Sequence, residues 1–388
     1  IQLVRYMYKF LNFQLLRKSI LRGRCHKPTQ LIFSKPQISA LKTFNMTTQV
    51  KQRAHDSLAE VTTDGAYTRK ESAFRNIVSV DNPDFQPEKN RYHLYISNAC
   101  PWANRCNAVR VFKRLDTIIG LSVVHPTWLK TKPDDKDDTH FGWAFTETTG
   151  SVTPPSGHGS IPNDGAIPDT VNGFKYVRDL YEASDDTLAK YTVPILWDTK
   201  HKVIVNNESS EILRMFNGDF AKLVGSDKDT VDLYPESLIS AIDDVNSWIY
   251  PQINNGVYRC GFAKTQQAYD TAVQELFDAL DKVEAILSKQ RYIASSEQIT
   301  EADTRLFMTL ARFDEVYIVY FKCNVRSISS YPNMINYVRE LYQMPFLTAT
   351  INMDHIKRHY FTSHPTLNTY SIIPKGSAAI EDFKKPHN

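Results

Sequence analysis

Cys100 is the residue of this chain whose setting best fits covalent chemistry. It follows a predicted strand over residues 91–97 and opens a predicted helix over residues 100–115, with Pro101 in the first turn. The amides and the dipole at a helix N-terminus stabilise a thiolate and lower the thiol pKa. Ala103 stands where a Cys-x-x-Cys pair would have its second cysteine. A mixed disulfide on Cys100 therefore needs an external thiol to resolve it. A buried structural cysteine is the alternative.

Two later stretches have the groups needed to bind glutathione, the obvious external thiol. Thr192-Val193-Pro194 precedes a predicted strand. In a thioredoxin-like fold we expect this proline to be cis, and the Val193 backbone would then pair with the peptide backbone of glutathione. Glu208 and Ser209 begin the next predicted helix. A helix N-terminus suits a carboxylate, and Glu208 can hold an ammonium group, which together match the γ-glutamyl end of glutathione. Taken alone, Glu208 and Ser209 could simply cap the helix.

The surrounding periodicities predict the elements that position these residues. The first part of the body alternates strands and helices, and the second part is helical from residue 233 on. A long stretch rich in Pro, Gly, Asp and Thr separates two strands of the first part. Besides those named above, we predict strands over 118–124, 192–197 and 202–205, and helices over 176–183, 208–216, 269–287, 334–342 and 348–359. A further helix begins at Thr300, with Asp303 completing a capping box.

This order predicts an α/β N-terminal domain followed by an all-α C-terminal domain. The predicted parts are a separable segment (1–45), an N-terminal arm (46–90), a glutathione-binding domain (91–220) with a long insertion (125–190), an all-helical domain (228–368) and an irregular tail (369–388).

Composition and charge exclude several classes of protein, namely disulfide-rich, nucleic-acid-binding and membrane-spanning proteins. Of 388 residues, 42% are hydrophobic, and the 5 cysteines are too few for a disulfide framework, so we expect a globular chain in a reducing compartment. Residues 1–45 are basic and lack Asp and Glu, whereas the rest is mildly acidic. The chain therefore offers no basic patch for nucleic acid and no apolar run for a membrane. We expect a cytoplasmic protein starting at Met46, or a mitochondrial one if residues 1–45 act as a presequence.

Several strings between residues 73 and 374 resemble the glutathionyl-hydroquinone reductases, the xi class of glutathione transferases, which is related to the omega class. The strings occur in the order found in that family: SNACPWANR, GWAF, YTVPILWD, IVNNESSEI, NNGVYRCGFA, ITEADTRLF, RFDEVYIVYFKCN, YPN and DHIKRHYFTSHPTLN. Cys-Pro-Trp-Ala is the most diagnostic, because many other transferases have Ser or Tyr as the catalytic residue.

The resemblance implies the glutathione transferase fold, with an α/β thioredoxin-like N-terminal domain and an all-α C-terminal domain. It also implies a role for each matching residue. Cys100 would be the nucleophile, Tyr258 would exchange a proton with the hydroquinone oxygen, and Tyr317 and Tyr360 would lower the pKa of Cys100 by hydrogen bonding. From the residues alone, a tyrosine of this kind is more often a core residue than a catalyst. The implied glutathione-binding residues are Trp143, Lys190, Tyr191, Thr192, Val193, Glu208 and Ser209.

The implied reaction is reduction of glutathionyl-hydroquinones, with glutathione as co-substrate, no permanent cofactor, no metal and a homodimeric enzyme. An omega-like thioltransferase or dehydroascorbate reductase, or a non-catalytic glutathione-binding module, remains the alternative. The chain departs from the family pattern at Asn104, where His is common, and at Thr362, where Arg is common. His355 and His359 have the i, i+4 spacing of metal ligands, but no third ligand accompanies them, so we expect surface or packing residues.

Overall fold

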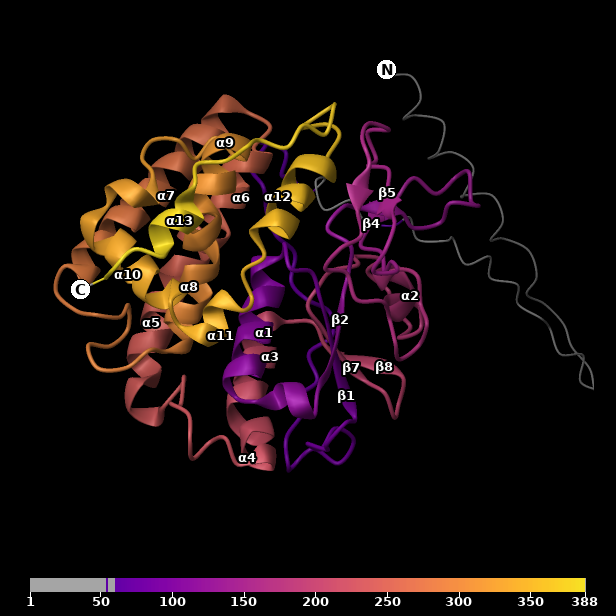
Figure 1. The fold of residues 1–388 in the computed structure, drawn as a ribbon, viewed down its shortest axis with the longest axis horizontal. Helices are drawn as coiled ribbons and strands as arrows, with labels where there is room; N and C mark the ends of the chain where they lie inside the picture. The colour runs from indigo at the N-terminus through magenta and orange to yellow at the C-terminus, as the bar shows by residue number, and fades with distance from the viewer. Residues whose placement is uncertain (1–53, 55–59, 388) are drawn as a thin grey trace, which may run out of the picture. The chain divides into compact units, whose positions relative to one another are not determined.

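The computed structural model describes residue 54 and residues 60–387 (Figure 1). The predicted separable segment, its alternative start at Met46, and the beginning of the predicted arm lie outside these residues. The described residues from 60 onward belong to one compact unit.

A four-stranded mixed sheet forms the centre of the first part. Its strands are β1 (Tyr92–Ile96), β2 (Gly120–Val123), β7 (Ile195–Asp198) and β8 (Val203–Asn206). The spatial order is β2-β1-β7-β8, with β1 parallel to β2 and antiparallel to β7, and β7 antiparallel to β8. All five residues of β1 are buried, because this strand is central and covered on both faces. The predicted strands of this part are confirmed.

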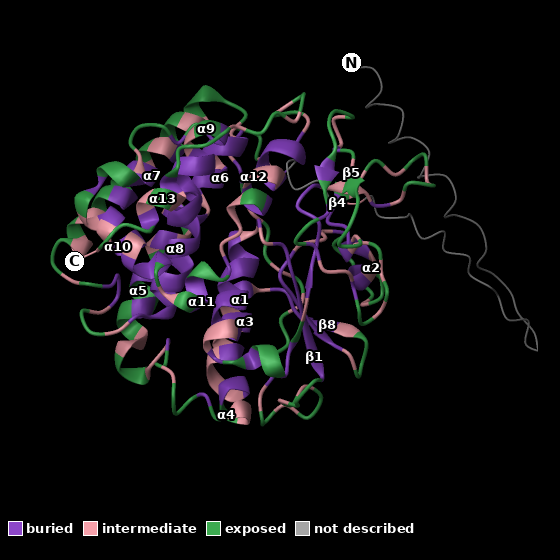
Figure 2. Cartoon of the chain, in the orientation of Figure 1, coloured by how far each residue is buried: buried purple, intermediate pink, exposed green. Residues whose placement is uncertain are grey.

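Helices cover both faces of the sheet. α1 (Pro101–Phe112) and α3 (Ser209–Met215) lie on one face and α2 (Val177–Glu182) lies on the other (Figure 1). The first ten residues of α1 are all buried, and the same is true of every residue of α8 (Glu301–Arg312), which packs against α1 (Figure 2). The start of α1 is therefore held between the sheet and the helical part of the chain.

The insertion between β2 and β7 is more ordered than the predicted loop. It contains two small antiparallel ribbons, β3 (Leu129–Lys130) with β4 (Phe141–Gly142) and β5 (Ser151–Val152) with β6 (Ile161–Pro162), before α2. Strands of two residues are too short to show a hydrophobic period, so sequence patterning could not reveal them.

The second part is helical, as predicted. Its helices are α4 (Ala221–Val224), α5 (Ile239–Ile249), α6 (Gly256–Phe262), α7 (Gln266–Leu287), α8, α9 (Ile318–Tyr320), α10 (Pro332–Tyr342), α11 (Pro345–Thr348) and α12 (Met353–Thr362), with π-helical turns at Phe216–Phe220, Tyr250–Asn254 and Phe313–Tyr317. The predicted single helix over 348–359 is divided between α11 and α12, and the prediction of one element there was wrong.

The C-terminal tail also differs from the prediction of irregular chain. A short helix, α13 (Ala379–Phe383), packs back onto α10. The Phe383 and Tyr342 rings lie 5.5 Å apart, and Arg339 forms an ion pair with Asp382 at 2.9 Å. A five-residue helix has almost no intrinsic stability, so these tertiary contacts, rather than local propensity, determine it.

Asp303 shows how the helical core is fixed. Its carboxylate is fully buried and accepts hydrogen bonds from the backbone amides of Thr300 and Ile293 and from the Tyr337 hydroxyl, each at 2.8 Å. The predicted capping box at Thr300 and Asp303 is present.

We expect Asp303→Asn to lower the free energy of unfolding by about 2–3 kcal/mol, because an amide NH₂ then faces donors that the carboxylate accepts. Urea denaturation measures this. The control Asp278→Asn changes an exposed acid on α7 and should stay within about 0.5 kcal/mol of wild type. Equal effects of the two substitutions would contradict this account of α8.

Candidate active site

The predicted nucleophile immediately precedes α1. Cys100 is the N-cap residue of this helix, with extended backbone angles, and Pro101 occupies the first turn. The Cys100 Sγ lies 3.5 Å from the Val193 carbonyl oxygen. Among the four described cysteines, Cys100 is the one that is partly exposed, whereas Cys106, Cys260 and Cys323 are buried.

Two opposing effects act on the Cys100 thiol. Burial raises its pKa, and the backbone amides of Ala103 and Trp102 and the charges of Arg69 and Arg312 act in the opposite direction. The net direction is upward, although the helix start does lower the pKa as one contribution, as predicted. The amides are in place, but the loss of hydration of the thiolate outweighs them.

The segment before β7 faces Cys100 through its backbone. The Val193–Pro194 peptide bond is cis, as predicted. The Tyr181 hydroxyl lies 3.0 Å from both the carbonyl oxygen and the Oγ1 of Thr192, and fixes this segment against α2. Thr192 and Val193 thus lie on the wall next to the sulfur.

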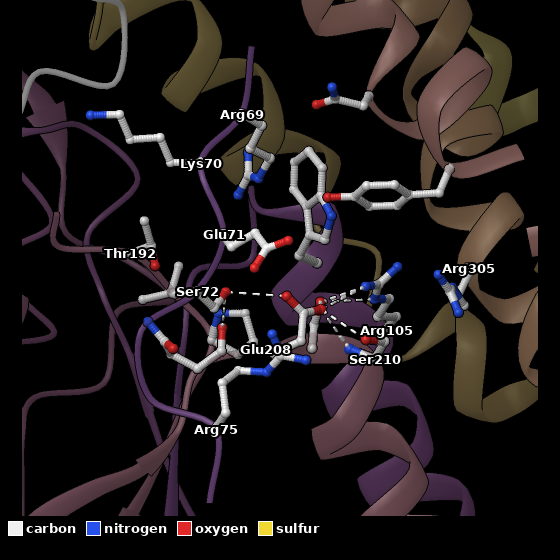
Figure 3. A pocket seen from close by; sticks show the side chains of 17 residues that line it. Arg69, Lys70, Glu71, Ser72, Arg75, Arg105, Thr192, Glu208, Ser210 and Arg305 are labelled. Carbon is white, nitrogen blue, oxygen red and sulfur yellow. Dashed lines mark hydrogen bonds and ion pairs between the residues drawn. The ribbon is translucent and has the colours of Figure 1, made fainter. Parts of the chain in front are cut away.

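A polar pocket of about 380 Å³ adjoins this segment and contains Glu208 and Ser209 (Figure 3). Glu208 caps α3, since its Oε1 accepts from the Ser210 amide at 3.1 Å, and Arg105 lies 3.7 Å from the same oxygen. Its Oε2 accepts from Ser72 Oγ at 3.1 Å. Burial opposes ionisation of Glu208, but Arg105 and the hydroxyl and amide donors leave its pKa below the usual value.

The buried Arg105 side chain also donates to Ser209 Oγ at 2.6 Å. Glu208 therefore caps the helix and faces the pocket at the same time, and Ser209 is the first residue of α3. The two interpretations of Glu208 from sequence do not exclude each other.

A second pocket, of about 90 Å³, opens beside the Cys100 sulfur and is mainly aromatic. Its walls include Trp143, Tyr258 and Tyr360, and it shares Arg69, Trp102, Thr192 and Val193 with the polar pocket. Trp143 follows β4 and stacks on His359, with ring centroids 4.5 Å apart. Trp143 thus reaches the site, as expected, through the insertion.

The three predicted catalytic tyrosines form one hydrogen-bonded cluster. The hydroxyl oxygens of Tyr258 and Tyr360 lie 2.5 Å apart, and those of Tyr317 and Tyr360 lie 3.1 Å apart. Burial raises the pKa of each phenol, so all three stay protonated at neutral pH. Tyr317 lies behind Tyr360 and does not line the pocket. The phenols bond to one another, and their proposed hydrogen bonds to the sulfur are not formed in this structure.

Two of the expected glutathione-binding residues are engaged elsewhere. Lys190 lines the aromatic pocket but forms an ion pair with the buried Glu60 at 2.6 Å. Tyr191 lines neither pocket and packs against Tyr181 and beneath the Arg178 guanidinium.

Comparisons with known proteins agree with this geometry. Residues 99–218 match the family model described as glutathione S-transferase, N-terminal domain, and residues 266–340 match glutathione S-transferase, C-terminal domain. The glutathionyl-hydroquinone reductase YqjG of Escherichia coli is 42% identical over 342 residues, which cover 86% of this chain and 95% of YqjG. The chain belongs to the xi-class glutathione transferases, the glutathionyl-hydroquinone reductase family.

Solved structures support the same family. The xi transferase from Phanerochaete chrysosporium superposes with a TM-score of 0.73 and 44% identity, covering 84% of this chain and 97% of that chain. The glutathione-bound structure of YqjG from Escherichia coli K-12 gives a TM-score of 0.71 and 42% identity, with coverage of 84% and 97%.

The residues at which this xi-class transferase departs from the family pattern have structural roles. Asn104 is buried and donates to the carbonyl oxygens of Asn98 and Thr350, both at 2.8 Å, which ties the chain before Cys100 to the chain after α11. The buried Thr362 hydroxyl lies 2.7 Å from that of Thr127, and Thr362 lines neither pocket.

The histidine pair at 355 and 359 packs within the fold, as expected. His355 lies 2.7 Å from the Asp164 carbonyl oxygen, and His359 stacks on Trp143. Within residues 60–387, no group of three or more His, Cys, Asp or Glu is arranged to hold a metal ion. In the same part of the chain, no helix is long and apolar enough to cross a membrane.

Sequence reasoning gave the N-terminal arm of this transferase no part in the site. The arm nevertheless supplies Glu60, Arg69 and Ser72 to the two pockets. The described residues 60–90 of the arm contain no helix or strand, so no periodicity pointed to these residues. The one available signal was the cluster of charged and hydroxyl residues between Arg69 and Arg75.

We expect the partial exposure of Cys100 to make it the first of the four described cysteines to react. Brief treatment of the native enzyme with iodoacetamide, followed by peptide mass spectrometry, should modify Cys100 well before Cys106, Cys260 or Cys323. The Cys100→Ala variant should show no comparably fast modification at those three positions, and fast modification of Cys106 would contradict the assignment.

Proposed function

We propose that this enzyme uses glutathione to reduce glutathionyl-hydroquinones to hydroquinones, through a disulfide between Cys100 and glutathione. One observation carries the proposal. The partly exposed Cys100 lines an aromatic pocket suited to a planar ring, and this pocket shares part of its wall, including Thr192 and Val193, with a polar pocket suited to a γ-glutamyl group. A conjugate in which sulfur joins glutathione to an aromatic ring fits this pair of pockets.

The polar pocket supplies the contacts that glutathione requires. Glu208 is ionised and can accept from the γ-glutamyl ammonium, while the amides at the start of α3 and the nearby Arg105 favour the adjoining carboxylate. The backbone of Val193, beside the cis proline, can pair with the cysteinyl backbone of glutathione, as an added strand does. These contacts place the sulfur of glutathione towards Cys100.

The first half of the reaction breaks the bond between carbon and sulfur. The Cys100 thiolate attacks the glutathionyl sulfur of the conjugate and forms a disulfide bond. The electron pair of the broken bond stays with the aromatic ring, whose carbon takes up a proton, so the ring leaves as the reduced hydroquinone. The aromatic pocket, with Trp143 and Tyr258 on its walls, holds the ring during this step.

The second half restores the enzyme. The thiolate of a free glutathione attacks the glutathionyl sulfur of the disulfide, releases oxidised glutathione and regenerates the Cys100 thiolate. No Cys-x-x-Cys partner competes, because Ala103 occupies that position and Cys106 is buried with its sulfur near the Trp102 and Ser209 carbonyl oxygens.

Tyr258 is the phenol best suited to assist proton transfer. It lines the aromatic pocket and its pKa is raised well above the usual value by burial, so it is protonated and can donate to a hydroquinone oxygen. Its neighbour Tyr360 can take part in relaying the proton through the hydrogen bond between the two hydroxyls. Tyr317 does not line the pocket, and its hydroxyl is hydrogen-bonded to that of Tyr360, so it serves to position Tyr360.

Cys100→Ala tests the proposed nucleophile. We expect it to reduce turnover of a glutathionyl-hydroquinone by at least about 1,000-fold, because nothing else in the site can take the glutathionyl group. Hydroquinone release is followed by liquid chromatography with saturating glutathione. Cys106→Ser, which changes a buried thiol on the same helix, should retain most of the activity. Retained activity in Cys100→Ala would refute the mechanism.

Tyr258→Phe separates the proposed reaction from plain thiol transfer. We expect kcat for the conjugate to fall about 10- to 100-fold, because proton donation to the ring oxygen is lost. Reduction of a small glutathione disulfide, which needs only Cys100, should be nearly unchanged. Equal loss on both substrates would favour a structural role for Tyr258, and efficient disulfide exchange with no conjugate reduction in wild type would favour an omega-like thioltransferase.

A further inference from the structure

The arm residue Arg69 has an unusual position between the two pockets. Its guanidinium carbon lies 4.0 Å from the centre of the Trp102 ring, in the first turn of α1, and the residue lines both pockets. Arg69 has no carboxylate within ion-pair distance among the described residues. Its charge acts mainly on phenols and on Cys100, and no carboxylate is among the largest influences on it.

The arm is fixed on both sides of Arg69. On the N-terminal side of Arg69, the Gly65 carbonyl oxygen accepts a hydrogen bond from the Lys264 amide at 2.9 Å. A side chain at Gly65 would collide with Thr265. On the C-terminal side, Ser72 Oγ lies within hydrogen-bond distance of the Asn207 carbonyl oxygen, at 3.3 Å, and donates to Glu208 (Figure 3). The guanidinium is therefore held in place by the clamped arm and by stacking on Trp102.

The other basic groups near Cys100 either form an ion pair with a carboxylate or donate their hydrogen bonds to backbone carbonyl oxygens. Lys190 is neutralised by Glu60, the acid of this pocket, at 2.6 Å. The Arg312 guanidinium lies beneath the loop before Cys100 and donates to the carbonyl oxygens of Asn98 and Ala99, at 3.4 and 3.2 Å. Arg312 adds to the positive potential at the sulfur, but its donors are committed to the backbone.

The remaining titratable groups of the pocket carry no charge at neutral pH. Burial lowers the pKa of His359 well below its usual value and that of His364 to about 4, so both imidazoles are neutral. Burial raises the pKa of Tyr67 to about 12 and that of Tyr258 and Tyr360 well above the usual value. Arg69 is thus the one uncompensated charge on the wall of the aromatic pocket, within the described part of the chain.

We propose that the Arg69 guanidinium is the counter-charge of the Cys100 thiolate, supplied to the site by the N-terminal arm. The proposal rests on the proposed function in that it assigns Arg69 to the nucleophile of that reaction. It differs from the expectation that Tyr317 and Tyr360 stabilise the thiolate, since those hydroxyls are bonded within the tyrosine cluster. A thiolate that burial disfavours needs an opposite charge nearby, and Arg69 is placed to provide it.

The rate of iodoacetamide alkylation of Cys100 as a function of pH tests this without any hydroquinone substrate. In Arg69→Gln and Arg69→Met, we expect the midpoint of the profile to rise by about one pH unit, with alkylation about 10-fold slower below both midpoints. Arg69→Lys keeps a positive charge and should lie near wild type. Met retains an apolar contact with Trp102, and circular dichroism establishes that each variant is folded.

Two controls make the result decisive. Arg114→Gln removes an exposed charge at the far end of α1, where Arg114 pairs with Asp229, and should leave the profile unchanged. If both neutral Arg69 variants, or whichever of them folds, titrate like wild type, the proposal is overturned. If the midpoint of the profile shifts in Tyr360→Phe but not in the Arg69 variants, the phenols rather than Arg69 stabilise the Cys100 thiolate. A failure of the hydroquinone reaction itself would appear in turnover and leave these profiles unaffected.

Discussion

The placement of one sulfur atom constrains most of this structure. Cys100 caps a helix whose first ten residues are buried between the central sheet and α8, and its Sγ lies 3.5 Å from the backbone of Val193. The α/β part therefore supplies the nucleophile and the backbone that faces it. The helical part supplies the support under α1 and the tyrosines. Neither part forms the site alone, which explains why their interface is packed so completely.

The same burial creates an electrostatic problem. Removing the thiol from water raises its pKa, whereas the proposed reaction requires a thiolate. The groups that lower the pKa of Cys100 come from three places in the chain. They are the amides of α1, the charge of Arg312 on α8 and the charge of Arg69 on the N-terminal arm. Charges on separate elements can favour the thiolate only when those elements are docked, so reactivity of the thiol is linked to correct assembly of the fold.

Features that depend on residues close together in the sequence were predicted correctly. The strand before Cys100, the helix that begins there and the capping box at Thr300 each follow from neighbouring residues, and all are present. The cis Val193–Pro194 bond is also present, but its prediction depended on assuming a thioredoxin-like fold. The two-part architecture followed from the change in hydrophobic period. The approach of Glu208 and Ser209 to the Cys100 site also followed, from the order of the motifs.

Features that depend on distant contacts could not be predicted. The helix α13 forms because Phe383 and Asp382 meet α10, and the pairing of Lys190 with Glu60 joins residues 130 positions apart. The direction of the Cys100 pKa shift depends on how deeply the completed fold buries the thiol. Arg69 reaches the site through a segment, residues 60–90, that contains no helix or strand, so it has no periodic pattern to interpret.

A single-turnover experiment tests the central claim that Cys100 itself takes the glutathionyl group. The enzyme is mixed with an excess of a glutathionyl-hydroquinone in the absence of free glutathione, and hydroquinone release and the intact protein mass are followed together. The account predicts a burst of one hydroquinone per Cys100 and one glutathione retained on the protein at that residue. Continued release without free glutathione, or a burst that leaves the protein mass unchanged, would contradict it.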